Sequence, residues 1–183
     1  MDEANVSTSA QHDPPADFEA LLWDLFLRLM DVPGDRVEAE ILEAQRRLCQ
    51  ALGLRRSALW QVPPGDGRKF LVTHVYDRDH DVPDTCGIDG SVARDDGRAF
   101  LLSDGMSVPL HADASEYFPW LVPRVLAGEL ISLPTIDALP PEAAQDAASL
   151  RRFETKSTVI VPLTVHGEVL GALSFASTQQ TRE

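Results

Sequence analysis

The C-terminal part of the chain constrains the fold most, because two apolar segments there are joined by a two-residue turn. The segments are Ser157–Val165 and Glu168–Ser177, and the turn is His166-Gly167. Glycine readily adopts the positive φ angle that a tight hairpin needs, so the pattern predicts two antiparallel strands. Pro162 has no N–H to donate, and we expect it where its strand is unpaired or bulged. Gly171 has no side chain, which allows a neighbouring group to approach the sheet closely.

Two helices are expected near the N-terminus. Apolar residues from Phe18 to Met30 recur at three- and four-residue spacing, and Asp17 can cap this first helix. Asp35 can cap a second helix, where Glu38 three residues later approximates a capping box and Gly53 suits the position after the end. The apolar spacing assigns the buried side of the second helix to Val37, Ile41, Leu48 and Leu52.

Short strands and an irregular acidic segment are expected next. Ser57–Val62 and Lys69–Tyr76 have the composition of strands and are joined by a turn rich in Pro and Gly, so we expect them to pair antiparallel. Residues 77–115 are acidic and the least regular part of the chain. Within them, Ser91–Ala93 and Ala99–Leu102 are predicted to form a hairpin around an Asp-Asp-Gly turn.

Apolar spacing predicts two more helices and one more strand before the terminal hairpin. The first helix lies within Tyr117–Ala127, where Pro123 implies a kink or a late start. A short strand is expected at Glu129–Leu133. Pro140-Pro141 can then open a helix whose apolar residues extend to Phe153.

Charge and length exclude several classes of protein. The chain has 183 residues and a formal net charge of −13, which opposes binding to nucleic-acid phosphates or anionic membranes. We find no signal-peptide pattern and no run that approaches the ~20 apolar residues of a membrane span. Cys49 and Cys86 lack the spacing of zinc or disulfide motifs, so we expect a cytoplasmic protein with Cys49 buried as a small apolar residue. A flexible tail is expected at residues 1–16 and one domain at 17–177.

Three segments together resemble the GAF domain family. Residues 157–175 (STVIVPLTVHGEVLGALSF) are similar to the typical ending of that domain, and residues 47–60 (RLCQALGLRRSALW) to its second helix and first strand. Phe118–Leu121 with Gly128–Ile131 is similar to a helix and strand in GAF domains of bacterial sensor histidine kinases and enhancer-binding transcriptional activators. The resemblance covers about residues 18–177.

The resemblance implies an α+β fold with a central antiparallel sheet of five to six strands. N-terminal helices would cover one face, and a helix and loop lid would cover a ligand pocket on the other. Residues 77–115 would be an acidic insertion, and 178–183 the start of a linker to an effector domain. The residues expected near the pocket are Trp60, Tyr76, Phe118, Trp120, Leu121, Lys156 and Ser157. Aromatic rings can hold a flat or apolar ligand, and plain core packing is the alternative role of the same residues.

The sequence carries no motif for catalysis, a metal or a cofactor. Asp77, Asp79 and Asp81 repeat the acidic start of a calcium loop, but Val82 and Ile88 stand where that loop needs Gly and Glu, which favours a solvated loop. Neither a GxSxG nor a phosphate-binding glycine motif occurs. The residues that mark cyclic-nucleotide-binding, bilin-binding and methionine-sulfoxide-reducing GAF domains are also missing. We therefore expect no enzymatic activity, no metal and no cofactor.

His74 is expected to be a structural residue, on a strand face shared with Phe70, Val72 and Tyr76. The leading hypothesis for the chain is a regulatory sensor domain that binds an unknown small molecule and relays its occupancy to a downstream kinase or transcription-activator domain. The alternative is a degenerate GAF domain that serves for dimerisation or interaction without a ligand. In both cases the apolar stripe at Phe18–Met30 can be buried on the sheet or on a partner helix, and we expect a homodimer through this helix. Redox sensing through Cys86 is a third hypothesis.

Overall fold

The computed structural model describes residues 17–65, 69–78, 99–101, 107–109 and 112–178. Its centre is a five-stranded sheet in the order β2-β1-β7-β6-β5, in which all neighbouring strands are antiparallel. This confirms the expected α+β fold and the pairing of the first two strands. The strands are β1 (Arg56–Gln61), β2 (Leu71–Asp77), β5 (Ile131–Leu133), β6 (Ser157–Val165) and β7 (Glu168–Ser177).

The terminal hairpin has the form that its sequence predicts. The turn between β6 and β7 has positive φ angles, 51° at His166 and 84° at Gly167. Pro162 lies beyond Thr158–Ile160, the stretch of β6 that pairs with β5, and such a position tolerates a missing N–H. A Cβ atom at Gly171 would lie 2.4 Å from the carbonyl oxygen of Trp60. The close neighbour of Gly171 is thus the backbone of β1.

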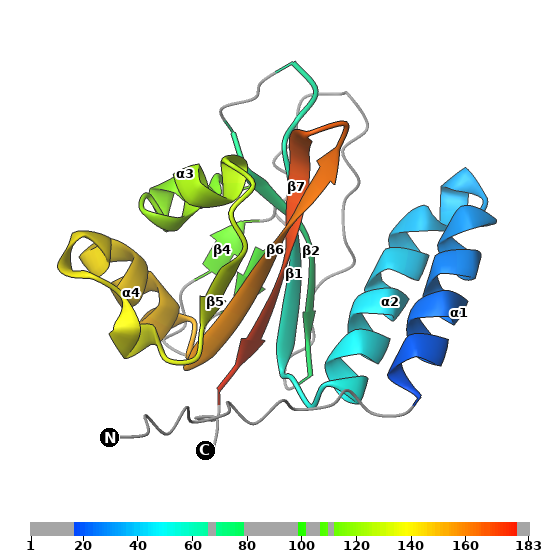
Figure 1. Cartoon of the computed structure of the whole chain (residues 1–183), viewed down its shortest axis with the longest axis horizontal. Helices are drawn as coiled ribbons and strands as arrows, with labels where there is room; N and C mark the ends of the chain where they lie inside the picture. Colours follow the sequence, from blue (N-terminus) through cyan, green and yellow to red (C-terminus); the bar gives the residue numbers. More distant parts are fainter. Residues whose placement is uncertain (1–16, 66–68, 79–98, 102–106, 110–111, 179–183) are drawn as a thin grey trace, which may run out of the picture.

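Helices α1 (Phe18–Met30) and α2 (Val37–Ala51) lie on one side of the sheet, with α2 between α1 and the strands (Figure 1). The predicted capping box of the second helix is wrong, because a 3₁₀ turn at Gly34–Arg36 precedes α2 and no side chain caps its first turn. Asp17 stands at the N-cap position of α1 without a side-chain cap hydrogen bond. Gly53 follows α2 with a φ of 65°, as expected.

The two helices are buried to different degrees. In α1 only Leu25 is buried, because α1 packs against α2 and not across the sheet. In α2 the buried residues are Ala44, Gln45 and Cys49, whereas Leu52 is 41% exposed. The burial of Cys49 is confirmed. The predicted residues Val37, Ile41 and Leu48 are half-buried on the same side of α2, so only the exposure of Leu52 departs from the prediction.

Helices α3 (Leu121–Leu126) and α4 (Ala144–Arg152) lie on the opposite side of the sheet (Figure 1). α3 starts late, as Pro123 implies, because proline in a first turn removes no intrahelical hydrogen bond. α4 follows Pro140-Pro141 as predicted. Three short 3₁₀ segments complete this side, at Ala114–Glu116, Ile136–Ala138 and Pro141–Ala143.

A separate two-stranded sheet joins β3 (Ala99–Leu101) to β4 (Ser107–Pro109). The predicted partner of β3, Ser91–Ala93, lies outside the described residues. The same holds for residues 1–16, for Cys86 and for most of the possible calcium loop. Among the helices that the structure describes, none is long and apolar enough to cross a membrane.

Candidate ligand-binding site

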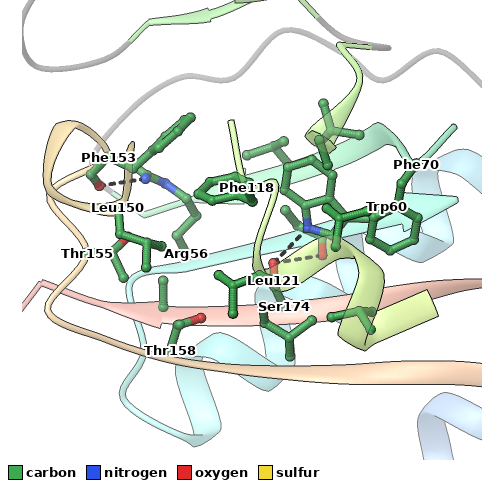
Figure 2. Close-up of a pocket in the computed structure, with 18 residues that line it drawn as sticks. Arg56, Trp60, Phe70, Phe118, Leu121, Leu150, Phe153, Thr155, Thr158 and Ser174 are labelled. Carbon is green, nitrogen blue, oxygen red and sulfur yellow. Dashed lines mark hydrogen bonds between the residues drawn. The ribbon is translucent and has the colours of Figure 1, made fainter. Parts of the chain in front are cut away.

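A cavity of about 80 Å³ lies between the sheet and helices α3 and α4 (Figure 2). Successive side chains of a strand point to opposite faces of a sheet, so alternate residues of each strand reach the cavity. From β1 these residues are Arg56, Ala58 and Trp60, and from the facing part of β7 they are Ser174 and Ala176. Thr158 and Ile160 of β6 extend the same surface.

Strand β2 departs from this alternation. Its register with β1 pairs Leu59 with His74 and Trp60 with Val72, so Thr73 has no directly opposite residue. Val72 and Val75 therefore both line the cavity, while His74 points to the other face, where its Nε2 lies 2.7 Å from Glu38 of α2. The predicted grouping of His74 with Val72 on one face is corrected, because an irregularity of this kind leaves no clear mark in the sequence.

Aromatic rings form one wall of the cavity. Trp60 stacks on Phe70 with ring centroids 6.0 Å apart and meets Phe118 edge-on at 6.1 Å. Phe118 in turn packs against Phe153 at 5.8 Å, and Tyr117 meets Phe153 edge-on at 6.3 Å. The rings join β1 and β2 to the segments that lead into α3 and out of α4.

Helix α3 covers the cavity with Leu121, Val122 and Val125. The amides at its N-terminus are held by Asp146 of α4, a fully buried residue. The carboxylate of Asp146 accepts hydrogen bonds from the backbone N–H of Trp120, at 3.1 and 3.2 Å, and of Leu121, at 2.9 Å. A carboxylate at this place satisfies amides that a helix leaves unpaired and interacts favourably with the helix dipole. Asp146 therefore fixes the lid of the cavity to α4.

Arg56 is the one ionisable side chain among the described residues that line the cavity. Its Nε donates to Oδ2 of Asp77 at 2.7 Å, Nη2 lies 2.6 Å from the same oxygen, and Nη1 donates to the carbonyl of Phe153 at 2.8 Å. Asp77 also accepts from Nε of Arg55 at 3.2 Å, and Arg55 pairs with Glu154 at 3.0 Å. These four charged side chains balance one another at the end of the cavity.

Three side chains with a hydroxyl group line the cavity, Thr155, Thr158 and Ser174, and two of them donate to the backbone. Ser174 donates to the carbonyl of Ala58 at 3.3 Å and accepts from Nε1 of Trp60 at 3.0 Å. Thr158 donates to the carbonyl of Phe175 at 2.8 Å. Figure 2 shows the bonds of Trp60 and Arg56 as dashed lines. The rest of the wall is mainly apolar.

The structure brings together three of the seven residues predicted to lie near the pocket. Trp60, Phe118 and Leu121 line the cavity. Trp120 packs beside the core with Arg124 over its ring, at 3.7 Å from the centroid. Ser157 pairs with Ser177 at the start of β6. Tyr76 and Lys156 do not line the cavity either. Tyr76 lies near Arg46 of α2, and Lys156 is exposed.

Sequence reasoning missed Arg56, Ser174 and Asp146. Arg56 and Ser174 share strand faces with Trp60 and Ala172, so a strict two-residue alternation could have found them. Asp146 gives no local signal, because it caps a helix 25 positions earlier in the chain.

Outside the cavity, two further groups have a defined environment. His74 is buried between Glu38 and the hydroxyl of Thr73, which lies 3.0 Å from its Nδ1, and this agrees with a structural role. Burial raises the pKa of the Cys49 thiol to about 12, so this cysteine stays protonated at neutral pH. In the described part of the chain, no cluster of three or more His, Cys, Asp or Glu side chains could hold a metal ion.

The sequence profile of the GAF domain matches residues 37–183. No curated protein sequence matches the chain. Several solved structures have a similar fold. The phycocyanobilin-bound GAF domain of a cyanobacterial phytochrome has a TM-score of 0.59 at 14% identity, and the match covers 90% of this chain and 82% of that one.

A second similar structure is the GAF domain of a phosphoenolpyruvate-protein phosphotransferase from Coxiella burnetii, with a TM-score of 0.56, 14% identity and coverage of 90% and 79%. A third is the NreA protein of Staphylococcus aureus, mutated in its nitrate-binding site, with a TM-score of 0.51, 13% identity and coverage of 79% and 87%. At these identities the similarity establishes the fold.

Proposed function

Because the chain belongs to the GAF family, we propose that it is a regulatory sensor domain of a bacterial signal-transduction protein, with its small-molecule site in the cavity under α3. The observation that carries this proposal is the cavity itself. It is preformed, its walls are mainly apolar, and a few polar groups have fixed orientations, as in binding sites for small ligands. Similar folds that hold phycocyanobilin or have a nitrate-binding site support it.

The composition of the walls favours regulation over catalysis. General acid–base and nucleophilic catalysis use groups such as His, Cys, Asp or Glu beside the substrate, whereas the one ionisable group described here is Arg56. In this proposal the cytoplasmic domain has no reaction of its own. Its occupancy shifts a conformational equilibrium that a downstream kinase or transcription-activator domain detects, as in two-component systems or transcription regulation.

The test is thermal unfolding of the purified chain with mixtures of small metabolites. A ligand at about 100 times its Kd stabilises by about 2.7 kcal/mol, which predicts a Tm increase of roughly 5–10 °C. Ala58→Leu should abolish the increase because it fills the cavity. Ala148→Leu makes the same change on the exposed side of α4 and should retain it. If every Tm increase survives Ala58→Leu, or none occurs, the proposed ligand site is wrong.

One observation favours the alternative, a dimerisation module without a ligand. Helix α1 exposes most of its apolar side chains, and an apolar surface of this kind marks an interaction site. The exposed residues are Leu22, Trp23, Phe26, Leu27, Leu29 and Met30. A homodimer through α1 is compatible with sensing, so the cavity and α1 are tested separately.

A further inference from the structure

We propose that the ligand of this cavity is an uncharged molecule that places a small, mainly apolar group in the cavity. This inference rests on the proposed function and specifies the chemistry of the same site. Three features carry it: the balanced charge of Arg56, the direction of the wall hydroxyls and the size of the cavity.

The charge of Arg56 is already used inside the protein. The side chain of Arg56 is 13% exposed and that of Asp77 is 3% exposed, and the two are joined through both Nε and Nη2 of the arginine. Arg55, which contacts Asp77, and Glu154, which contacts Arg55, add a second cation and a second anion. An anionic ligand would bring a third negative charge into a buried, balanced group, and such a charge is costly without a new partner. Arg56 thus orients Phe153 and leaves the cavity electrically neutral.

The wall hydroxyls offer acceptors to a ligand. The proton of Ser174 is donated to Ala58, the proton of Thr158 to Phe175, and the indole proton of Trp60 to Ser174. These three donors are directed within the wall, while hydroxyl oxygens keep lone pairs that can accept one further hydrogen bond. A neutral N–H or O–H group fits the free lone pairs of Ser174 and Thr158.

The volume limits the size of the ligand. Sites for drug-sized molecules measure roughly 300–1,000 Å³, and an engineered apolar cavity of roughly 150 Å³ binds benzene. The cavity here measures about 80 Å³. It is about half the size of the benzene site and therefore accommodates a small aliphatic group, with Trp60, Phe70 and Phe118 as flat apolar contacts.

Isobutyramide and isobutyrate test the inference, because they have the same shape and differ in charge; benzene and nitrate extend the comparison. Binding is measured at pH 7.5 from the Trp60 indole signal and backbone amide signals in ¹H–¹⁵N spectra. We expect isobutyramide to bind at least tenfold more tightly than isobutyrate or nitrate, and benzene, which is larger than the cavity favours, to bind weakly. Ala58→Leu should remove this binding, and Ala148→Leu should preserve it.

Isobutyrate or nitrate that binds as tightly as isobutyramide, in a manner sensitive to Ala58→Leu, overturns the inference and leaves the sensor proposal standing. If neither the four probes nor the metabolite mixtures bind the cavity, both proposals fall. Asp77→Asn provides a second comparison, because it removes the negative charge beside Arg56, and the amide spectrum verifies that the variant is folded. We expect a tenfold or larger gain in isobutyrate affinity; unchanged affinity in the folded variant contradicts the charge argument.

Discussion

Asp146 is the single side chain with the clearest structural effect on the cavity. It is fully buried and accepts hydrogen bonds from two amides of the lid helix, and α3 has no other side-chain cap. Asp146→Ala should reduce the free energy of unfolding by about 2–3 kcal/mol, because it leaves buried amides without their charged acceptor. Urea unfolding measures the change. Asp137→Ala removes an exposed partner of Arg151 and should cost less than about 1 kcal/mol; equal losses would contradict the role of Asp146.

The sequence predicts the role of a residue when that role depends on its neighbours in the chain. It misses roles that depend on a partner far away in the sequence. His166 and Gly167 are predictable because a two-residue turn demands their backbone angles. Asp146 and Arg56 act on partners 25 and 97 positions away, and neither pattern nor spacing indicates such pairs. The aromatic residues Trp60 and Phe118 were predictable near the pocket through family resemblance, whereas the outward position of Tyr76 depends on strand register.

Strand β7 packs closely against β1 at Gly171, which has no side chain. Gly171 faces Gln61, and a methyl group there would meet the Trp60 carbonyl at 2.4 Å, so Gly171→Ala must move β7 away from β1. We expect a loss of about 1–3 kcal/mol in the free energy of unfolding, measured by urea titration. Gly34→Ala is the matched control, because nothing lies within 4 Å of the added Cβ, and it should change stability by less than about 0.5 kcal/mol. A similar loss in both variants would argue against the strand contact.

Helices and strands were predictable where a single turn or proline residue determines their start or end. The terminal hairpin and the late start of α3 follow from Gly167 and Pro123, and both are confirmed. The predicted capped start of α2 was wrong, because the residues expected to form the cap belong to a 3₁₀ turn. The apolar stripe of α1 was predicted, but not the element that covers it. An apolar stripe identifies a face that avoids water, but which element covers that face is a property of the whole molecule.

The exposed stripe on α1 leads to a prediction about assembly. Trp23, Phe26, Leu27 and Met30 follow the i, i+3, i+4, i+7 spacing of a helix-pairing surface and remain exposed. Leu25→Asp is unsuitable as a test, because Leu25 is buried in the contact of α1 with α2 and a charge there would destabilise the fold. Leu27→Asp places the charge on the exposed stripe instead.

We expect the wild-type chain to dimerise and Leu27→Asp to raise the dimer Kd at least tenfold, in sedimentation measurements over a concentration series. Leu130→Asp is the control, since Leu130 is 59% exposed and Leu27 63%, and only Leu27 belongs to α1. A dimer that resists Leu27→Asp but dissociates with Leu130→Asp would move the interface to the other side of the sheet, beside β5. A chain that is monomeric at all concentrations would remove the dimerisation alternative and leave the cavity as the functional site to test.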